Sequence, residues 1–156
     1  MKNTIVILLY KLLELEISLE EFYENLVLND FVNSNFALKN TAVILAAEEK
    51  KHVDIYRQFV KQAELKEEII IADSIMGQVD YFLINLRHSI NSYGIVTAGQ
   101  LIAKAIDNEN KQIFLITQIM ELLKIETMPL FLQEMFAFLL KEEQKHLANL
   151  MPFNKM

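Results

Sequence analysis

The sequence predicts an all-α fold, an antiparallel four-helix bundle of two helical hairpins joined by a long crossover that contains a helix. Turn signals are few, since the 156 residues include 3 Gly and 2 Pro, and 53% of the residues are hydrophobic. Apolar residues also recur at helical spacing through four long segments. A Glu-x-x-His motif occurs twice, from Glu49 to His52 and from Glu143 to His146, which indicates an internal repeat.

The first hairpin is predicted from two segments on either side of a turn near residue 32. One helix is expected from about Thr4 to Leu28 and a second from about Phe36 to Ala63, with an Asn-rich segment between them. The apolar face of the first helix carries Glu16, and that of the second carries Glu49. At about 1.5 Å of rise per residue, these two Glu reach nearly the same height.

Residues 64 to 96 are predicted to form the crossover. Polar residues 64 to 68 and a short apolar run at 69 to 71 come first, and a helix-like pattern follows from Ile75 to Ile90. A segment of this length is sufficient to carry the chain back along the bundle.

The second hairpin repeats the first. A helix is expected from about Thr97 to Lys124 and another from about Pro129 to Met151, with Pro129 in the first turn. Glu109 and Glu143 straddle this turn as Glu16 and Glu49 straddle the first one. The offset between the two halves is 93 to 94 residues, which indicates a duplicated hairpin.

Composition limits the class of protein. The length fits a single domain over residues 1 to 156, and the absence of Cys excludes disulfides and any Cys-ligated zinc or iron–sulfur centre. A net charge of −6 argues against nucleic-acid binding. No apolar run is long enough to span a membrane, and Lys11 cuts the run that could resemble a signal peptide. We therefore expect a cytoplasmic protein, and the apolar residues left over on the crossover favour a homodimer.

The repeat predicts a metal site. One Glu from each of two helices and a Glu-x-x-His from each of the other two would meet at one level of the bundle, the arrangement of di-iron and di-manganese carboxylate proteins. The six candidate ligands are Glu16, Glu49, His52, Glu109, Glu143 and His146. Four carboxylates balance the charge of two divalent cations. Carboxylate oxygens with one imidazole per metal favour iron or manganese over a structural zinc.

Other interpretations of these residues remain open at this point. His52 and His146 could form solvated surface pairs with the preceding Glu. A small shift in register would select Glu20 or Asp107 in place of the two lone Glu ligands. Tyr23 could be a core aromatic residue whose hydroxyl is hydrogen-bonded.

The chain resembles the rubrerythrin branch of the ferritin-like superfamily over about residues 8 to 150. The family's Glu-x-x-His lies in the second helix of each hairpin, as it does here. In the first helices, Tyr23 follows Glu16 by about two turns, and Ala105 precedes Glu109 by four residues, both in the family's spacing.

The resemblance implies a ferritin-like fold and a role for each candidate residue. Glu49 and Glu143 would bridge two iron ions, and Glu16 and Glu109 would be terminal ligands. Each His would bind one metal, and Tyr23 would place a hydroxyl beside the ligands.

Two departures from the family pattern affect the expected function. Gln112 stands where rubrerythrins carry an additional Glu that is linked to a redox-dependent movement of one iron. The chain also has no four-Cys rubredoxin domain, so the electrons would come from a separate electron-donor protein.

Three functions follow as hypotheses. The first is a peroxidase-type oxidoreductase, in which a diferrous site reduces hydrogen peroxide and is re-reduced by the external donor. The second is a ferroxidase that uses dioxygen to oxidise Fe(II), with or without iron storage. The third is a non-catalytic helical module, either stabilised by metal or purely structural. In each case, no catalytic residue is expected beyond the metal ligands.

Overall fold

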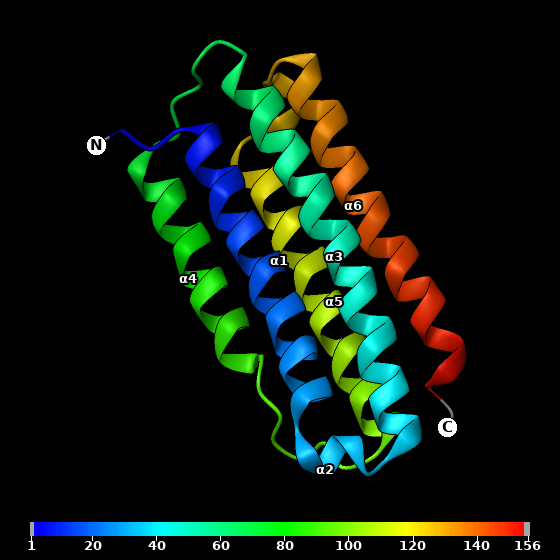
Figure 1. The fold of residues 1–156 in the computed structure, drawn as a ribbon. Helices are drawn as coiled ribbons and strands as arrows, with labels where there is room; N and C mark the ends of the chain where they lie inside the picture. The colour runs from blue at the N-terminus through cyan, green and yellow to red at the C-terminus, as the bar shows by residue number, and fades with distance from the viewer. Residues whose placement is uncertain (1, 155–156) are drawn as a thin grey trace.

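The computed structural model describes residues 2–154 and is helical, with no strand within that range (Figure 1). Short 3₁₀ helices occur at Ile125–Thr127 (η1) and Met151–Phe153 (η2). The α-helices are α1 (Ile5–Leu28), α2 (Asp30–Asn33), α3 (Phe36–Glu64), α4 (Asp73–Ser89), α5 (Ala98–Leu122) and α6 (Leu130–Leu150). The predicted all-α class is confirmed.

Each helix predicted from the sequence is present with bounds close to those expected. The first long helix begins after Thr4, whose side chain accepts a hydrogen bond from the Ile7 N–H. Asn35 caps α3 in the same way, and a capping box of Thr97 and Gln100 begins α5. The short helix α2 was not predicted. It forms because the Asn29 side chain accepts hydrogen bonds from two backbone N–H groups in the segment expected to be a turn.

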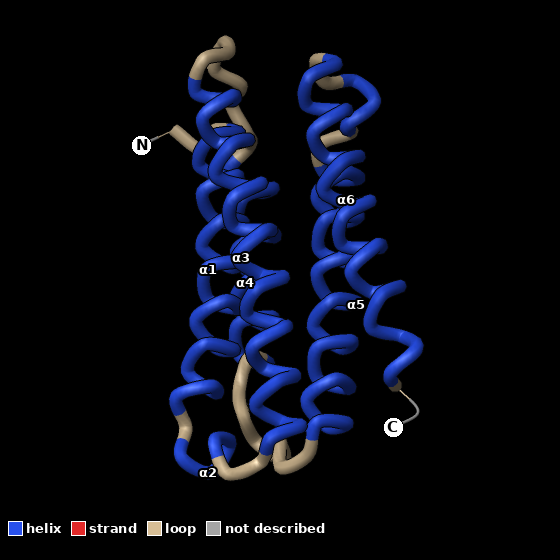
Figure 2. Tube along the Cα trace, turned by 45° about the vertical axis from the view of Figure 1, so that its right-hand side comes forward, coloured by secondary structure: helices blue, strands red, loops and turns tan. Residues whose placement is uncertain are grey.

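The long helices pack in two antiparallel pairs. Helix α1 lies along α3 and α5 lies along α6, and a further contact joins α3 to α5 (Figures 1 and 2). Because α3 and α5 run in the same direction, residues that follow Glu49 and Glu109 lie toward the same end of the molecule.

Helix α4 packs against α1 and α5, on the side of the molecule away from α6 (Figure 1). It buries an apolar stripe of Met76, Val79, Leu83 and Leu86. Two ion pairs tie it to α1: Lys11 Nζ lies 2.8 Å from Asp80 Oδ1, and Arg87 lies 3.5 Å from Glu14. Helix α4 is thus held to α1 at two positions along its length.

A short backbone pairing fixes the beginning of this crossover. Thr4 and Ile70 form an isolated antiparallel bridge, in which the Ile71 N–H donates to the Asn3 carbonyl oxygen at 2.8 Å. The Ile5 N–H donates to the Ile69 carbonyl oxygen at 3.0 Å. The apolar run predicted at 69 to 71 therefore lies against the start of α1.

Two apolar clusters fill the interior, one toward each end of the helices. Along α3, the smaller cluster includes Leu45 and the larger one resumes at Val53, with Glu49 and His52 between them. Along α5, the smaller cluster likewise ends at Ile106 and the larger one begins at Leu115, with Glu109 between them. A layer of buried charged and polar residues therefore separates the two apolar clusters.

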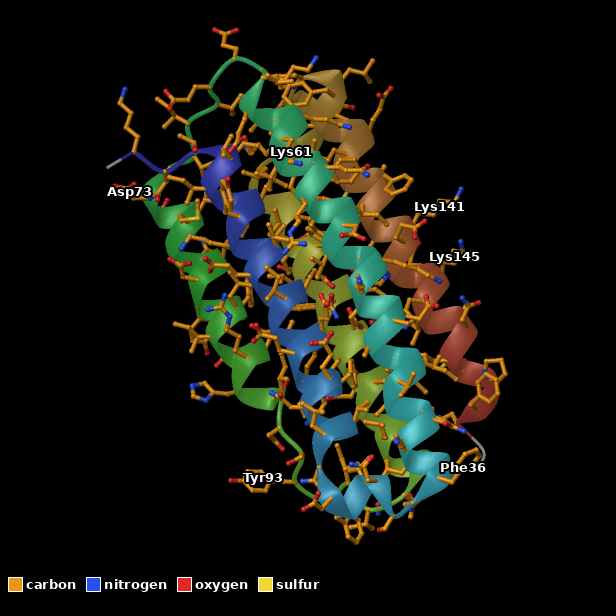
Figure 3. All side chains as sticks on the ribbon, viewed as in Figure 1. Phe36, Lys61, Asp73, Tyr93, Lys141 and Lys145 are labelled. Carbon is orange, nitrogen blue, oxygen red and sulfur yellow. The ribbon has the colours of Figure 1, made fainter. Side chains whose placement is uncertain are left out.

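The outer faces of α3 and α6 are charged. Lys61, Lys141 and Lys145 are exposed, and the last two extend away from α6 (Figure 3). Across the described residues, no helix combines the length and the apolar character needed to cross a membrane.

Candidate metal centre

Four helices bring the six candidate ligands together in the polar layer between the apolar clusters. The four Glu are each 1% exposed and the two His are each 4% exposed. Their ligand atoms form two overlapping groups in which all atoms lie within 4.8 Å of one another. One group consists of Glu49, His52, Glu109 and His146, and the other of Glu16, His52 and Glu143. This buried cluster could hold a metal ion.

His52 faces three carboxylates through one ring nitrogen. Its Nδ1 atom lies 3.5 Å from Glu49 Oε2, 3.6 Å from Glu16 Oε2 and 3.6 Å from Glu143 Oε2. These oxygens come from three different helices, so they surround the nitrogen atom rather than pairing with it singly.

His146 faces the other side of the cluster. Its Nδ1 atom lies 2.7 Å from Glu109 Oε1 and 3.8 Å from Glu49 Oε1. The two imidazole rings are 5.0 Å apart between centroids and nearly perpendicular, at 87°. Since Glu49 directs Oε2 toward His52 and Oε1 toward His146, this carboxylate lies between the two imidazoles.

The polar atoms at the centre of the cluster are not satisfied by the protein. Within the described chain, no hydrogen-bond partner exists for one oxygen of each of the four Glu, for Nδ1 of His52 or for either ring nitrogen of His146. Each unsatisfied buried group costs about 1–3 kcal/mol, so the arrangement is expensive without a further ligand. Metal–ligand bonds of about 2.0–2.2 Å place neighbouring ligand atoms about 3 Å apart. The separations of 2.7–3.8 Å therefore fit atoms that surround a shared cation.

Burial makes the negative charge of this cluster costly. Burial and the nearby Glu143 raise the pKa of Glu16 and of Glu109 well above the ordinary value. Burial also raises the pKa of Glu143. For Glu49, burial alone would raise the pKa, but the contact with His52 at 3.5 Å and attraction to both imidazoles lower it. A negative charge on Glu16, Glu109 or Glu143 is therefore disfavoured by burial, and a bound cation would offset this cost.

The two imidazoles differ in their electrostatic surroundings. Burial alone would lower the pKa of His52, but the carboxylates of Glu16, Glu49 and Glu143, each within 3.6 Å of its Nδ1 atom, raise it to about 12. Burial lowers the pKa of His146. A metal that binds Nδ1 of His52 must therefore displace a proton, which links metal binding to pH.

The structure distinguishes Glu16 and Glu109 from the nearby acidic residues that a shift in register would have selected. Asp107 is exposed and pairs with Lys111 at 2.8 Å, so it is directed away from the cluster. Glu20 is only partly buried and belongs to neither group of potential ligands. Glu16 and Glu109 are the residues of α1 and α5 that reach the cluster. Both His are also buried, so neither forms the solvated surface pair that the sequence left open.

Tyr23, predicted to lie beside the ligands, and Gln112, at the position of the family's additional Glu, are both buried, at 1% and 2% exposure. Burial and the nearby Glu49 raise the pKa of the Tyr23 hydroxyl. Gln112 lies one turn after Glu109, and neither atom of its amide has a hydrogen-bond partner among residues 2–154. The polar layer thus extends beyond the six candidate ligands.

Sequence reasoning missed two polar residues of this layer, Tyr56 and Asn108. The Tyr56 hydroxyl donates to Glu143 Oε1 at 3.5 Å. Its sequence signal is its position seven residues after Glu49, the same spacing as Tyr23 after Glu16. Asn108 is 1% exposed, beside Tyr23, and makes no hydrogen bond of standard geometry with any described residue. Its signal is helical spacing from Ala105, which places it on the inner face of α5.

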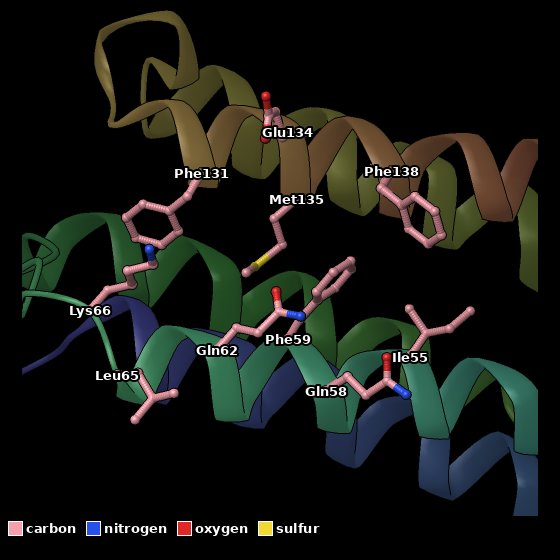
Figure 4. Close-up of a pocket in the computed structure, with 10 residues that line it drawn as sticks. All are labelled: Ile55, Gln58, Phe59, Gln62, Leu65, Lys66, Phe131, Glu134, Met135 and Phe138. Atoms are coloured by element: carbon pink, nitrogen blue, oxygen red, sulfur yellow. The ribbon is translucent and has the colours of Figure 1, made fainter.

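A cavity of about 640 Å³ lies between α3 and α6 but is not part of this cluster (Figure 4). Phe59 and Phe138 meet across it edge to face, with 5.6 Å between ring centroids, and Lys66 lies over the Phe131 ring. Of the six candidate ligands, all within the described range, none lines this cavity.

Comparison of the chain with protein-family models, curated proteins and solved structures gives no match. The resemblance to rubrerythrins therefore stays a prediction, and the candidate centre rests on its geometry and chemistry.

Proposed function

We propose that the protein is a di-iron carboxylate protein with a ferritin-like four-helix bundle of the rubrerythrin type, which reduces hydrogen peroxide with electrons from an external donor protein. The observation that carries this proposal is the position of Glu49 between two buried imidazoles, each of which also faces a further buried Glu. This is the set of ligands that two metal ions with a bridging carboxylate require.

The arrangement of helices supports the ferritin-like interpretation. Both antiparallel pairs contribute one Glu from the first helix and a Glu-x-x-His from the second. In this interpretation, α4 is the helix of the crossover between two duplicated hairpins.

The charge and the donor atoms support a pair of divalent cations. Four carboxylates and two neutral imidazoles carry four negative charges, which two such cations neutralise. His52 and Glu16 would hold one ion, His146 and Glu109 would hold the other, and Glu49 would lie between them with Glu143 beside His52. Iron suits this mixed oxygen and nitrogen set, as does manganese.

The metals, when bound as ferrous ions, supply the two electrons that convert hydrogen peroxide to water. The protein residues orient the ligands and limit the access of water. Tyr56 donates a hydrogen bond to Glu143 and so orients that carboxylate. Burial and Glu143 raise the pKa of Tyr56, so the phenol keeps the proton that it donates. The apolar clusters on both sides of the layer exclude bulk water.

The proposal is tested by mixing anaerobic Fe(II)-loaded protein with hydrogen peroxide or with dioxygen and following iron oxidation by stopped-flow absorbance. We expect oxidation by peroxide to be about tenfold faster or more. Faster oxidation by dioxygen would indicate a ferroxidase instead. If neither oxidant oxidises the protein-bound Fe(II) faster than it oxidises free Fe(II), the protein is not a redox enzyme of this kind.

A further inference from the structure

A second cavity along the side between α3 and α6 reaches the candidate metal centre. It has a volume of about 360 Å³, and its walls are formed mainly by Ile44, Leu45, Ile102, Leu150 and Phe153. His146 lines it as well. The cavity is therefore apolar over most of its surface and ends against an imidazole of the cluster.

This apolar cavity adjoins a smaller polar one. The smaller cavity, of about 90 Å³, is lined by both His52 and His146. Glu48, His146 and Asn149 line both cavities, so the two spaces meet at these side chains. A molecule with an apolar body and a polar end could occupy both spaces, with the polar end at the imidazoles.

The size and lining of these cavities fit a small organic molecule. Sites for small ligands typically have about 300–1,000 Å³, mostly apolar walls and a few polar groups at one end. Hydrogen peroxide has no apolar part and would leave the larger cavity unused. An organic hydroperoxide has the same reactive O–O bond and also carries an alkyl or aryl group.

We infer that the centre accepts organic hydroperoxides, with the alkyl or aryl group in the apolar cavity and the O–O end toward His146. This inference rests on the proposed function and specifies its substrate class. In the reaction, the O–O bond breaks, and one oxygen leaves as water while the other remains as the alcohol. Two protons are taken from solvent, and two ferrous ions become ferric by giving up one electron each. The external donor then reduces them again.

The kinetic test uses cumene hydroperoxide on Fe(II)-loaded protein. Ile44 is 62% exposed at the cavity wall, so Ile44→Asp introduces a charge there without disturbing the core. We expect the oxidation rate to saturate with cumene hydroperoxide, and Ile44→Asp to raise the half-saturating concentration about tenfold or more. The matched control is Ile84→Asp on α4, where the native residue is 53% exposed, and the constant should stay within about twofold of native.

A binding test that needs no turnover uses the zinc-loaded chain labelled with ¹⁵N at its three His. The probe is 2-phenyl-2-propanol, the alcohol formed from cumene hydroperoxide. We expect a saturable shift of the His146 signals, no shift of the exposed His88, and no saturable shift in Ile44→Asp.

The two tests distinguish failure of this inference from failure of the proposed function. Oxidation by hydrogen peroxide without saturation by cumene hydroperoxide, and without a His146 shift, overturns the inference and leaves the function standing. The absence of oxidation by either peroxide overturns both. A second copy of the chain seated over Ile44 would also abolish the His146 shift, and that result counts against the inference.

Discussion

The Nδ1 atom of His146 lies 2.7 Å from Oε1 of Glu109, yet the two atoms form no hydrogen bond. The oxygen lies outside the direction in which an N–H at this nitrogen would point. Two such atoms placed side by side, both buried, are arranged as ligands of a common cation rather than as donor and acceptor.

Metal should stabilise the fold, because the unpartnered atoms of the cluster gain bonds that the unfolded chain lacks. We expect Mn(II) at about one hundred times its dissociation constant to raise the unfolding free energy by about 2.7 kcal/mol per site. Denaturation followed by circular dichroism measures this gain. His146→Ala should lose most of it, whereas the exposed His88→Ala should retain it. An equal gain in both variants would place the metal elsewhere.

The metal-free protein should become less stable as pH rises. Glu16 and Glu109 have raised pKa values when folded, so the folded state binds more protons than the unfolded state above about pH 4.5. The raised pKa of His52 extends this loss above about pH 6.5, while the lowered pKa of His146 opposes it. Each proton contributes about 1.4 kcal/mol per pH unit. Urea denaturation should therefore give a higher unfolding free energy at pH 5 than at pH 8.

The variant Glu16→Gln checks the origin of this pH dependence. It removes one buried carboxyl with little change in size, so the difference between pH 5 and pH 8 should shrink. If the native protein is instead more stable at pH 8, the carboxyls are not held in the protonated form, and the electrostatic account of the cluster is wrong.

Tyr56→Phe should weaken metal binding while leaving the fold intact. The change leaves Glu143 Oε1 without its hydroxyl donor and costs about 0.5–1.5 kcal/mol of stability. Loss of such an orienting contact typically lowers metal affinity by about 10–100-fold. Competition with a chelator measures the affinity. Tyr81→Phe, at a tyrosine that is 65% exposed, is the control and should bind as native does. If Tyr56→Phe binds metal with native affinity, Tyr56 does not orient a ligand of the metal.

The stability of the larger apolar cluster should depend on Phe136. It should not depend on Phe138, which lies two residues later on α6. Phe136 is 0% exposed and Phe138 is 45% exposed. We expect Phe136→Ala to cost about 3–5 kcal/mol of unfolding free energy and Phe138→Ala much less, as measured by urea denaturation. Similar losses in both variants would mean that the face between α3 and α6 is buried in solution by another molecule.

The helices could be predicted from the sequence because their apolar residues follow helical spacing over many turns. The short helix α2 was missed because it depends on one side chain, Asn29, that caps four residues in a segment otherwise typical of a turn. Cap geometry of this kind is decided by backbone angles that composition does not reveal.

The six candidate ligands named from the sequence lie together in the structure, but their contacts could not be predicted. The repeated motif pointed to Glu49 and Glu143 because each is the Glu of a Glu-x-x-His, one on α3 and one on α6. The motif contains no signal for the orientation of Glu49 between the imidazoles, which depends on side-chain rotamers in the packed interior. Tyr56 was missed because a tyrosine on an apolar stripe is equally typical of a core residue, and only its position relative to Glu143 distinguishes the two cases.

The most direct test of the account is the metal content of the protein, measured by mass spectrometry after anaerobic loading with Fe(II). The native chain should be compared with Glu49→Ala/Glu143→Ala and with Glu48→Ala/Glu142→Ala, which removes the preceding, more exposed Glu of each motif. The account predicts about two irons per chain in the native protein and in the second variant, and a large loss in the first. Equal, near-zero iron in all three would contradict it and leave the repeated Glu-x-x-His as part of a purely structural helical protein.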